Sequence, residues 1–230
     1  KLEGAKTLNT MANSMLGKAK IGLEYLLKRS GPMSMAPSQL GAFSKSRPDL
    51  ETPDLEYHVQ PLSLEAFGQP LHEFPAITAS VCNLRPESRG TVTITSKNPN
   101  DAPRISPNYL STEGDKQTAV AAIRQARRIM SHGPMSKYKP HEIKPGIYSD
   151  ADEDLVKAAG DIGTTIFHPV GTVRMGADET APLDKRLKFR GIGNLRVVDA
   201  SIMPTITSGN TNSPTIMIAE KAADMILSRE

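Results

Sequence analysis

The chain has 230 residues and a formal net charge of +3, with 28 Lys and Arg against 25 Asp and Glu. This length allows one large domain or two small ones with a substantial core. The weak charge gives no indication of nucleic-acid binding, and the hydrophobic content of 38% argues against disorder. No apolar run reaches the ~18–20 residues of a transmembrane helix. The single cysteine, Cys82, excludes an internal disulfide and a zinc site built on several cysteines.

The first predicted element is a helix over residues 10–29. Its apolar side chains recur at helical spacing, and its Lys-Arg ending suits the negative end of the helix dipole. The apolar residues are Met15, Leu16, Ala19, Leu23, Leu26 and Leu27. The Ser-Gly-Pro sequence that follows is expected to end this helix.

The middle of the chain is predicted to be rich in strands. Residues 55–61 and 90–96 alternate between polar and apolar side chains, and residues 76–84 are rich in β-branched ones. Polar, proline-containing loops separate these segments, and no segment of helical length lies between them. The pattern favours an antiparallel sheet flanked by helices, which is an α+β fold.

A long helix is predicted over residues 112–131. One face is apolar and comprises Val120, Ile123, Ala126 and Met130. The other face carries Arg124, Arg127 and Arg128, which indicate either an anion-binding patch or, the favoured interpretation, an ordinary solvated face.

Two more helices are expected towards the end of the chain. One follows Ser149 and has four acids in its first turn, which suit the helix dipole better than a calcium loop. The other begins with Ser213 as N-cap and Pro214 at the first helical position. Apolar residues dominate 215–227, so this last helix is expected to be mostly buried.

Two clusters are candidates for chemistry. His168 lies in Phe-His-Pro-Val-Gly, where Pro169 restricts the backbone and Gly171 permits a turn. A histidine held in this way suits a general base, although taken alone an ordinary structural histidine is the commoner case. Residues 208–214 place two amides before a helix N-terminus, which suits either a site for negative charge or a simple capping loop.

Several long stretches resemble the carboxy-terminal part of glucose–methanol–choline family flavoprotein oxidoreductases. They are FHPVGTVRMG (167–176), LRVVDASIMPTITSGNTNSPTIMIAEKAADMI (195–226), SRGTVTITSKNP and RISPNYLSTEGD. The resemblance implies a substrate-binding domain over residues 1–189 and a strand–helix segment, 190–230, that returns to an FAD-binding domain. The glycine fingerprint of that FAD domain is not in this sequence. We therefore expect a fragment that folds, retains little FAD and shows no turnover alone.

The resemblance also implies roles for individual residues. His168 matches the catalytic base, which takes the alcohol proton as hydride passes to flavin N5. The family's partner residue falls on Asn210, with Asn212 as the alternative and otherwise a flavin contact. The remaining expected cofactor contacts are Asp199, Ala200, Pro214 and Thr215.

The substrate implied by the resemblance is an alcohol. Phe167 precedes the catalytic histidine, where choline enzymes tend to have Tyr, and the chain has no Trp and only 4% aromatic residues. A cage for a quaternary ammonium needs several aromatic faces, so a neutral primary alcohol is favoured over choline. Oxygen or a quinone-type acceptor would reoxidise the flavin. A binding module without catalysis is the alternative function, no metal site is expected, and the expected location is cytoplasmic.

Overall fold

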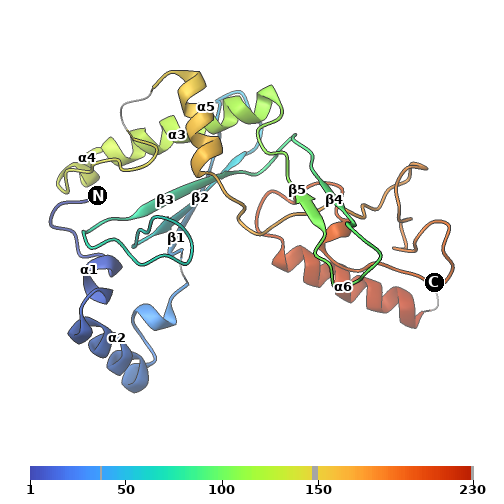
Figure 1. Cartoon of the computed structure of the whole chain (residues 1–230), viewed down its shortest axis with the longest axis horizontal. Helices are drawn as coiled ribbons and strands as arrows, with labels where there is room; N and C mark the ends of the chain where they lie inside the picture. Colours follow the sequence, from blue (N-terminus) through green and yellow to red (C-terminus); the bar gives the residue numbers. More distant parts are fainter. Residues whose placement is uncertain (37, 147–149, 229–230) are drawn as a thin grey trace. The chain divides into compact units, whose positions relative to one another are not determined.

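Three strands form an antiparallel sheet in the order β1-β2-β3 (Figure 1). They are β1 (Leu40–Ser44), β2 (Leu55–Gln60) and β3 (Thr78–Asn83). The computed structural model describes residues 1–36, 38–146 and 150–228. The predicted strands 55–61 and 76–84 and their antiparallel pairing are confirmed, whereas β1 was not predicted. Its sequence, Leu-Gly-Ala-Phe-Ser, has few β-branched side chains and so gives little signal.

The chain forms two compact units. The first comprises Lys1–Asn83 and Lys116–Gly163, and the second Leu84–Asp115 and Thr164–Glu230. The three-stranded sheet belongs to the first unit, together with most of the long helix α3 (Glu113–Ser131). The predicted helix over 112–131 is therefore confirmed.

Helix α3 covers one face of the sheet. Leu55, Tyr57 and Ala122 are buried together, with Val81 and Ala126 packed against them. The Tyr57 hydroxyl donates a hydrogen bond of 2.8 Å to Gln125 Oε1 on the helix. Because side chains alternate along a strand, the residues between these on β2 lie on the opposite face.

Two of the three arginines of α3 form ion pairs, whereas Arg128 is exposed as the favoured interpretation predicted. Arg127 donates two hydrogen bonds of 2.9 Å to the carboxylate of Glu142. Arg124 contacts Asp152, at the start of α5 (Asp152–Ile162), at 2.7 Å. Acids within the same unit match these two charges, so the preferred interpretation of the sequence was wrong for them. The helix predicted after Ser149 is confirmed from Asp152 onward; residues 147–149 lie outside the described part.

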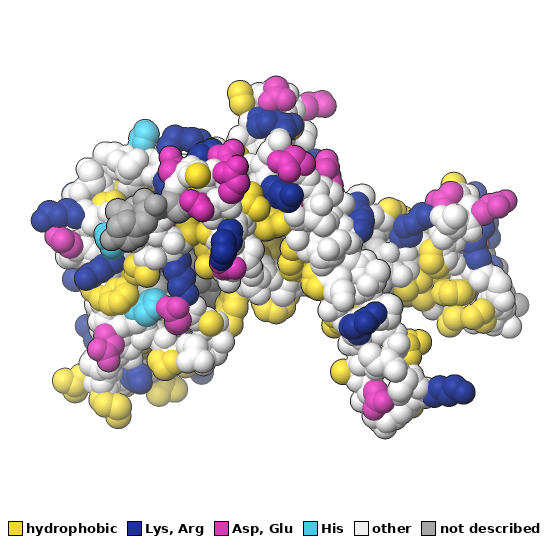
Figure 2. Space-filling model, turned by 45° about the horizontal axis from the view of Figure 1, so that its top comes forward, with side chains coloured by type: hydrophobic (Ala, Val, Ile, Leu, Met, Phe, Trp, Pro, Cys, Tyr) yellow, Lys and Arg dark blue, Asp and Glu magenta, His cyan; other side chains and the backbone are white. Residues whose placement is uncertain are grey.

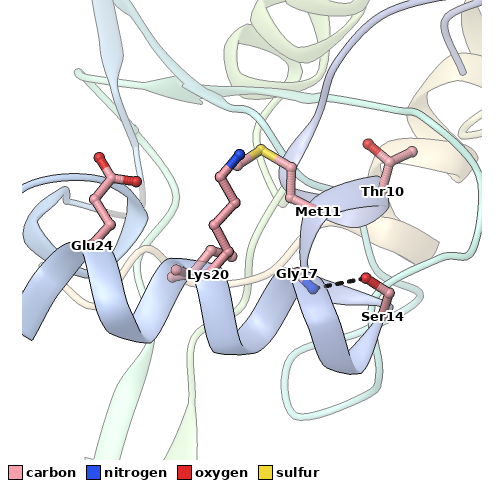
Figure 3. A pocket seen from close by; sticks show the side chains of 7 residues that line it. Thr10, Met11, Ser14, Gly17, Lys20 and Glu24 are labelled. Atoms are coloured by element: carbon pink, nitrogen blue, oxygen red, sulfur yellow. Dashed lines mark hydrogen bonds between the residues drawn. The ribbon is translucent and has the colours of Figure 1, made fainter.

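The predicted helix 10–29 is two helices, α1 (Leu8–Ala12) and α2 (Met15–Lys28). The break comes at Ser14, whose side chain accepts a 2.9 Å hydrogen bond from Gly17 N–H and caps α2 (Figure 3). At Gly17 a Cβ would lie 1.8 Å from the carbonyl oxygen of Met11, so only glycine fits this approach. A shallow pocket of ≈ 240 Å³ lies beside α2 and is lined by none of the predicted site residues.

The apolar stripe of α2 faces outward. Leu16 and Met15 are 86% and 82% exposed, whereas Ile21 on the other side of the helix is buried. Figure 2 shows hydrophobic side chains exposed at its lower left, the part in which α1 and α2 lie in Figure 1. A short turn, η1 (Pro32–Ser34), follows Gly31.

The second unit has less regular structure. Strands β4 (Thr91–Thr93) and β5 (Arg104–Ser106) form an exposed antiparallel pair, so the strand predicted over 90–96 is confirmed in part. The rest is mostly irregular, with a short turn η2 (Ala200–Ile202) and the helix α6 (Asn212–Leu227). The buried cluster of this unit is Leu183, Leu187, Ile202, Met203, Ile218 and Ala222.

Helix α6 differs from expectation in two ways. Its N-cap is Thr211, not Ser213, so Pro214 is the third helical residue. It is also mostly exposed: Ile218 and Ala222 are buried, but Ile216 and Met217 are 55% and 59% exposed. The apolar residues therefore include an outward face that the described residues leave exposed. The short helix α4 (Gly133–Ser136) completes the elements, and no helix of the described residues has the length and hydropathy to cross a bilayer.

Candidate active site

The stretch that contains His168 lies along residues 201–203. Val173 N–H and Met175 N–H donate hydrogen bonds to the carbonyl oxygens of Ser201 and Ile202, at 3.1 and 2.8 Å. Gly171 has a φ of +90°, and a Cβ there would lie 3.4 Å from the Met203 carbonyl oxygen. The glycine is thus needed for its backbone angle, since a Cβ would make only an ordinary van der Waals contact.

Two polar residues before α6 hold the His168 ring from opposite sides. The amide nitrogen of Asn210 lies 2.8 Å from Nε2, and the hydroxyl of Thr211 lies 3.0 Å from Nδ1. His168 is half-buried, Asn210 is exposed and Thr211 is buried. Residues separated by more than forty positions in the sequence therefore form one cluster, as the resemblance implied for His168 and Asn210.

Thr211 was not among the predicted site residues. Its side chain does not cap the helix that it precedes, although threonine often does so at this position. The hydroxyl contacts His168 Nδ1 instead, and the Thr211 N–H also points to Nδ1 at 3.3 Å. The one signal in the sequence was a threonine at a helix start, which indicates a cap and not a histidine partner.

The neighbours of the ring bear on its protonation. A neutral histidine has one N–H, and the group hydrogen-bonded to one nitrogen sets the tautomer. The two shorter contacts, 2.8 Å to Nε2 and 3.0 Å to Nδ1, are both satisfied with the proton on Nδ1, which then donates to Thr211 Oγ1 while Nε2 accepts from the Asn210 amide. The longer approach of the Thr211 N–H to Nδ1, at 3.3 Å, requires the other tautomer. The tautomer protonated on Nδ1 leaves the lone pair of Nε2 directed towards Asn210, at the exposed side of the cluster.

The predicted cofactor residues lie at the start of η2 and in the first turn of α6. Asp199 is the N-cap of η2, and its carboxylate accepts hydrogen bonds from the N–H and hydroxyl of Ser201. Thr215 donates its hydroxyl to the Thr211 carbonyl oxygen at 2.6 Å. Asn212 is exposed in the first turn of α6, and Ala200 and Pro214 are half-buried. Phe167 is 69% exposed beside His168.

An ion pair orders the turn that follows this stretch. Arg174 donates two hydrogen bonds of 2.8 Å to the carboxylate of Asp178. The guanidinium, with help from the Thr180 hydroxyl, holds the pKa of Asp178 well below its usual range. The carboxylate is thus charged at neutral pH and keeps this turn closed.

Comparison with known sequences decides the family. The GMC oxidoreductase profile matches residues 86–219, which is more than half of the chain and includes His168 and Asn210. The chain belongs to the GMC oxidoreductase family. Members of this family are FAD-dependent oxidoreductases, as the sequence resemblance indicated.

Curated relatives agree with this assignment. The chain is 41% identical over 218 residues to an alcohol dehydrogenase [acceptor] of Pseudomonas putida, covering 94% of the chain and 40% of that protein. It is 40% identical over 215 residues to an oxygen-dependent choline dehydrogenase of Vibrio vulnificus, covering 93% of the chain and 38% of that protein. The chain thus spans about two-fifths of the length of these relatives.

A solved structure supports the fold. The whole chain superposes on 45% of a formate oxidase with a TM-score of 0.90, at 24% sequence identity. The α+β fold with small antiparallel sheets and helices is therefore confirmed as that of the GMC carboxy-terminal region.

Proposed function

We propose that this chain is the substrate-domain part of an FAD-dependent oxidoreductase that converts a primary alcohol to an aldehyde. The observation that supports this best is the contact of His168 Nε2 with the Asn210 amide, in a member of the GMC family. We also propose that the chain by itself has no turnover. The proposed division into a substrate-binding domain, 1–189, and a returning segment, 190–230, belongs to the same hypothesis.

His168 would act as the base. In the tautomer with the proton on Nδ1, which can donate to Thr211 Oγ1, Nε2 is the nitrogen that can accept a proton from a substrate hydroxyl. A hydroxyl that enters between the ring and Asn210 can donate to Nε2 and accept from the amide N–H. The amide then stabilises the negative charge that grows on the substrate oxygen, an effect typically worth about 3 kcal/mol.

The residues around α6 fit a bound flavin. Thr211 gives the first turn of α6 no side-chain cap, so the N–H groups at this positive end of the helix can bind another acceptor. Donors of this kind suit a group that carries negative charge. FAD, when bound, supplies the acceptor for the hydride that leaves the alcohol carbon. Asn212 and the outward face of α6 would hold it, together with Pro214 and Thr215 in the first turn of α6 and Asp199 and Ala200 at the start of η2.

The substrate is proposed to be neutral. Curated relatives include both an alcohol dehydrogenase and choline dehydrogenases at similar identity. Phe167 lacks a hydroxyl, and the chain offers few aromatic faces for a quaternary ammonium. Choline is the second candidate because of the named relatives, and parallel assays with a linear primary alcohol and choline would separate the two.

The test is replacement of the base in a full-length protein that includes the FAD-binding domain. His168→Ala should slow flavin reduction by the alcohol about 10²–10⁴-fold, because proton removal from the hydroxyl loses its acceptor. His141→Gln is the matched control, since His141 is exposed and belongs to the other unit. Near-normal flavin reduction in His168→Ala would remove His168 from the mechanism.

A further inference from the structure

The face of the sheet that is turned away from α3 carries a set of polar side chains. Glu56 and His58 alternate on β2 with the residues that pack on the helix, so both lie on this other face. Antiparallel pairing places Cys82 of β3 directly opposite Glu56. A carboxylate, an imidazole and a thiol thus share one face of two neighbouring strands.

These three side chains converge. His58 Nε2 lies 3.5 Å from one oxygen of Glu56, and Cys82 Sγ lies 4.0 Å from the other. Their ligand atoms all lie within 4.8 Å of one another. Four ligands around a tetrahedral zinc ion, with bonds of about 2.0–2.3 Å, are about 3.3–3.8 Å apart. Small side-chain rotations therefore bring the three atoms to the spacing of ligands on one ion.

The burial of the cluster is unusual for its composition. Glu56 is only 6% exposed, and His58 Nε2 is buried without a hydrogen-bond partner among the described residues. A buried carboxylate and an unsatisfied buried nitrogen both cost free energy unless something pairs with them. A cation bound between them would satisfy the nitrogen lone pair and balance the carboxylate charge.

The neighbouring strand leaves room at this point. Gly41 of β1 pairs with His58, so β1 places no side chain beside the imidazole. Phe43 of β1 pairs with Glu56 and provides an apolar neighbour on the other side of the cluster. An ion here would have three protein ligands, and its fourth position could take water.

We propose that Glu56, His58 and Cys82 form a binding site for a zinc-class divalent transition metal. Thiolate, imidazole and carboxylate together are the donor set of zinc and of its spectroscopic substitute cobalt(II), and the thiolate disfavours calcium and magnesium. The ion would join β2 to β3 through side chains, and binding would release the thiol proton. The site uses none of the residues of the proposed active site, so the two proposals stand or fall separately.

The test is titration of the purified full chain with Zn²⁺ and Co²⁺ at neutral pH. We expect one tightly bound ion per chain by calorimetry, and a Co²⁺ complex with an intense thiolate-to-metal charge-transfer band. Cys82→Ser should abolish this band. Cys82→Ser and His58→Gln should each weaken affinity at least as much as the roughly 10–100-fold that loss of an outer-shell partner causes.

Matched controls make the result decisive. His141→Gln removes an exposed histidine close to the N-terminal amine, and it should leave the affinity and spectrum unchanged. If a variant fails to fold, the wild-type Co²⁺ spectrum still decides, because Cys82 is the one cysteine of the sequence. Absence of stoichiometric binding, a Co²⁺ complex without the thiolate band, or binding that persists in both variants would overturn the proposal.

Discussion

In the first unit, the buried Leu55 and Tyr57 belong to a strand and pack on a helix, whereas the buried Leu183 and Leu187 of the second unit belong to irregular segments. The first arrangement positions side chains by a repeating backbone. The second positions them by individual turns, several of which need an unusual backbone angle, such as Gly171 and Leu187. The proposed active site lies in the second kind of structure, so its geometry depends on the packing beneath it.

The largest losses of stability are expected when a fully buried leucine is truncated in each unit. Leu183→Ala and Leu155→Ala each remove a fully buried leucine, one from each unit, and each should lower the free energy of unfolding by about 2–5 kcal/mol. Only Leu183→Ala should also shift the NMR signals of the His168 ring, because Val170 and Val173 pack on the same cluster. Denaturant titration and ring spectra of both variants would check this. Equal disturbance of His168 by both would contradict the distinction between the units.

A smaller loss of stability is expected when the buried Asp115 of the second unit is replaced. The buried carboxylate of Asp115 accepts hydrogen bonds from the N–H groups of Glu87 and Ser88, at 2.9 and 2.8 Å. Burial acts to raise the pKa of Asp115, but the hydrogen bonds from Ser88 and Glu87 outweigh it, so the pKa is lowered. Asp115→Asn should cost about 1–3 kcal/mol of unfolding free energy at neutral pH.

The lowered pKa of Asp115 also predicts how this loss of stability depends on pH. A lowered pKa in the folded state stabilises the protein fully above the unfolded pKa of about 3.9, and this contribution is lost as the pH falls through the folded value. The difference between wild type and Asp115→Asn should therefore be constant near neutrality and shrink in acid below about pH 4. A difference that grows on acidification would show that the carboxylate is not stabilised in this way.

The smallest change in stability is expected at Thr211, whose hydroxyl contacts His168, the proposed base. Thr211→Val keeps the shape of the buried side chain but removes the hydroxyl that faces His168 Nδ1, which should cost about 1 kcal/mol. The ¹⁵N chemical shifts of the ring should then report less of the tautomer protonated on Nδ1. Thr211→Ser should restore the wild-type shifts, and unchanged shifts in Thr211→Val would show that the hydroxyl does not set the tautomer.

The regular elements were the part of the fold that sequence patterns could reveal. Helix α3 and strand β2 have apolar residues at the period of their own backbone, so their positions followed from the pattern. The break between α1 and α2 at Ser14 did not follow from the pattern. Apolar residues continue at helical spacing past Ser14, and the N-cap depends on the single hydroxyl of this residue. The exposure of α6 was missed since periodicity shows where apolar residues gather, not what covers them.

The residues indicated both halves of the candidate site, but only the resemblance predicted that the two halves meet. His168 and Asn210 are 42 positions apart, and no spacing rule connects two loops that meet through irregular backbone. Thr211 was missed because its partner is equally remote and its local sequence indicates a cap. The cluster of Glu56, His58 and Cys82 depends on strand register, which the pattern of single strands does not determine.

Phe167 has a φ of +66°, a left-handed backbone that costs a side chain of this size roughly 1–2 kcal/mol. Unbranched side chains meet a similar cost there, Val and Ile meet a larger one, and glycine meets none. Exchanges among Phe, Tyr, Leu and Met at this position therefore leave the local backbone energy nearly constant. A library of such exchanges would report on what the side chain itself touches, whereas a glycine variant would change the flexibility of the whole turn.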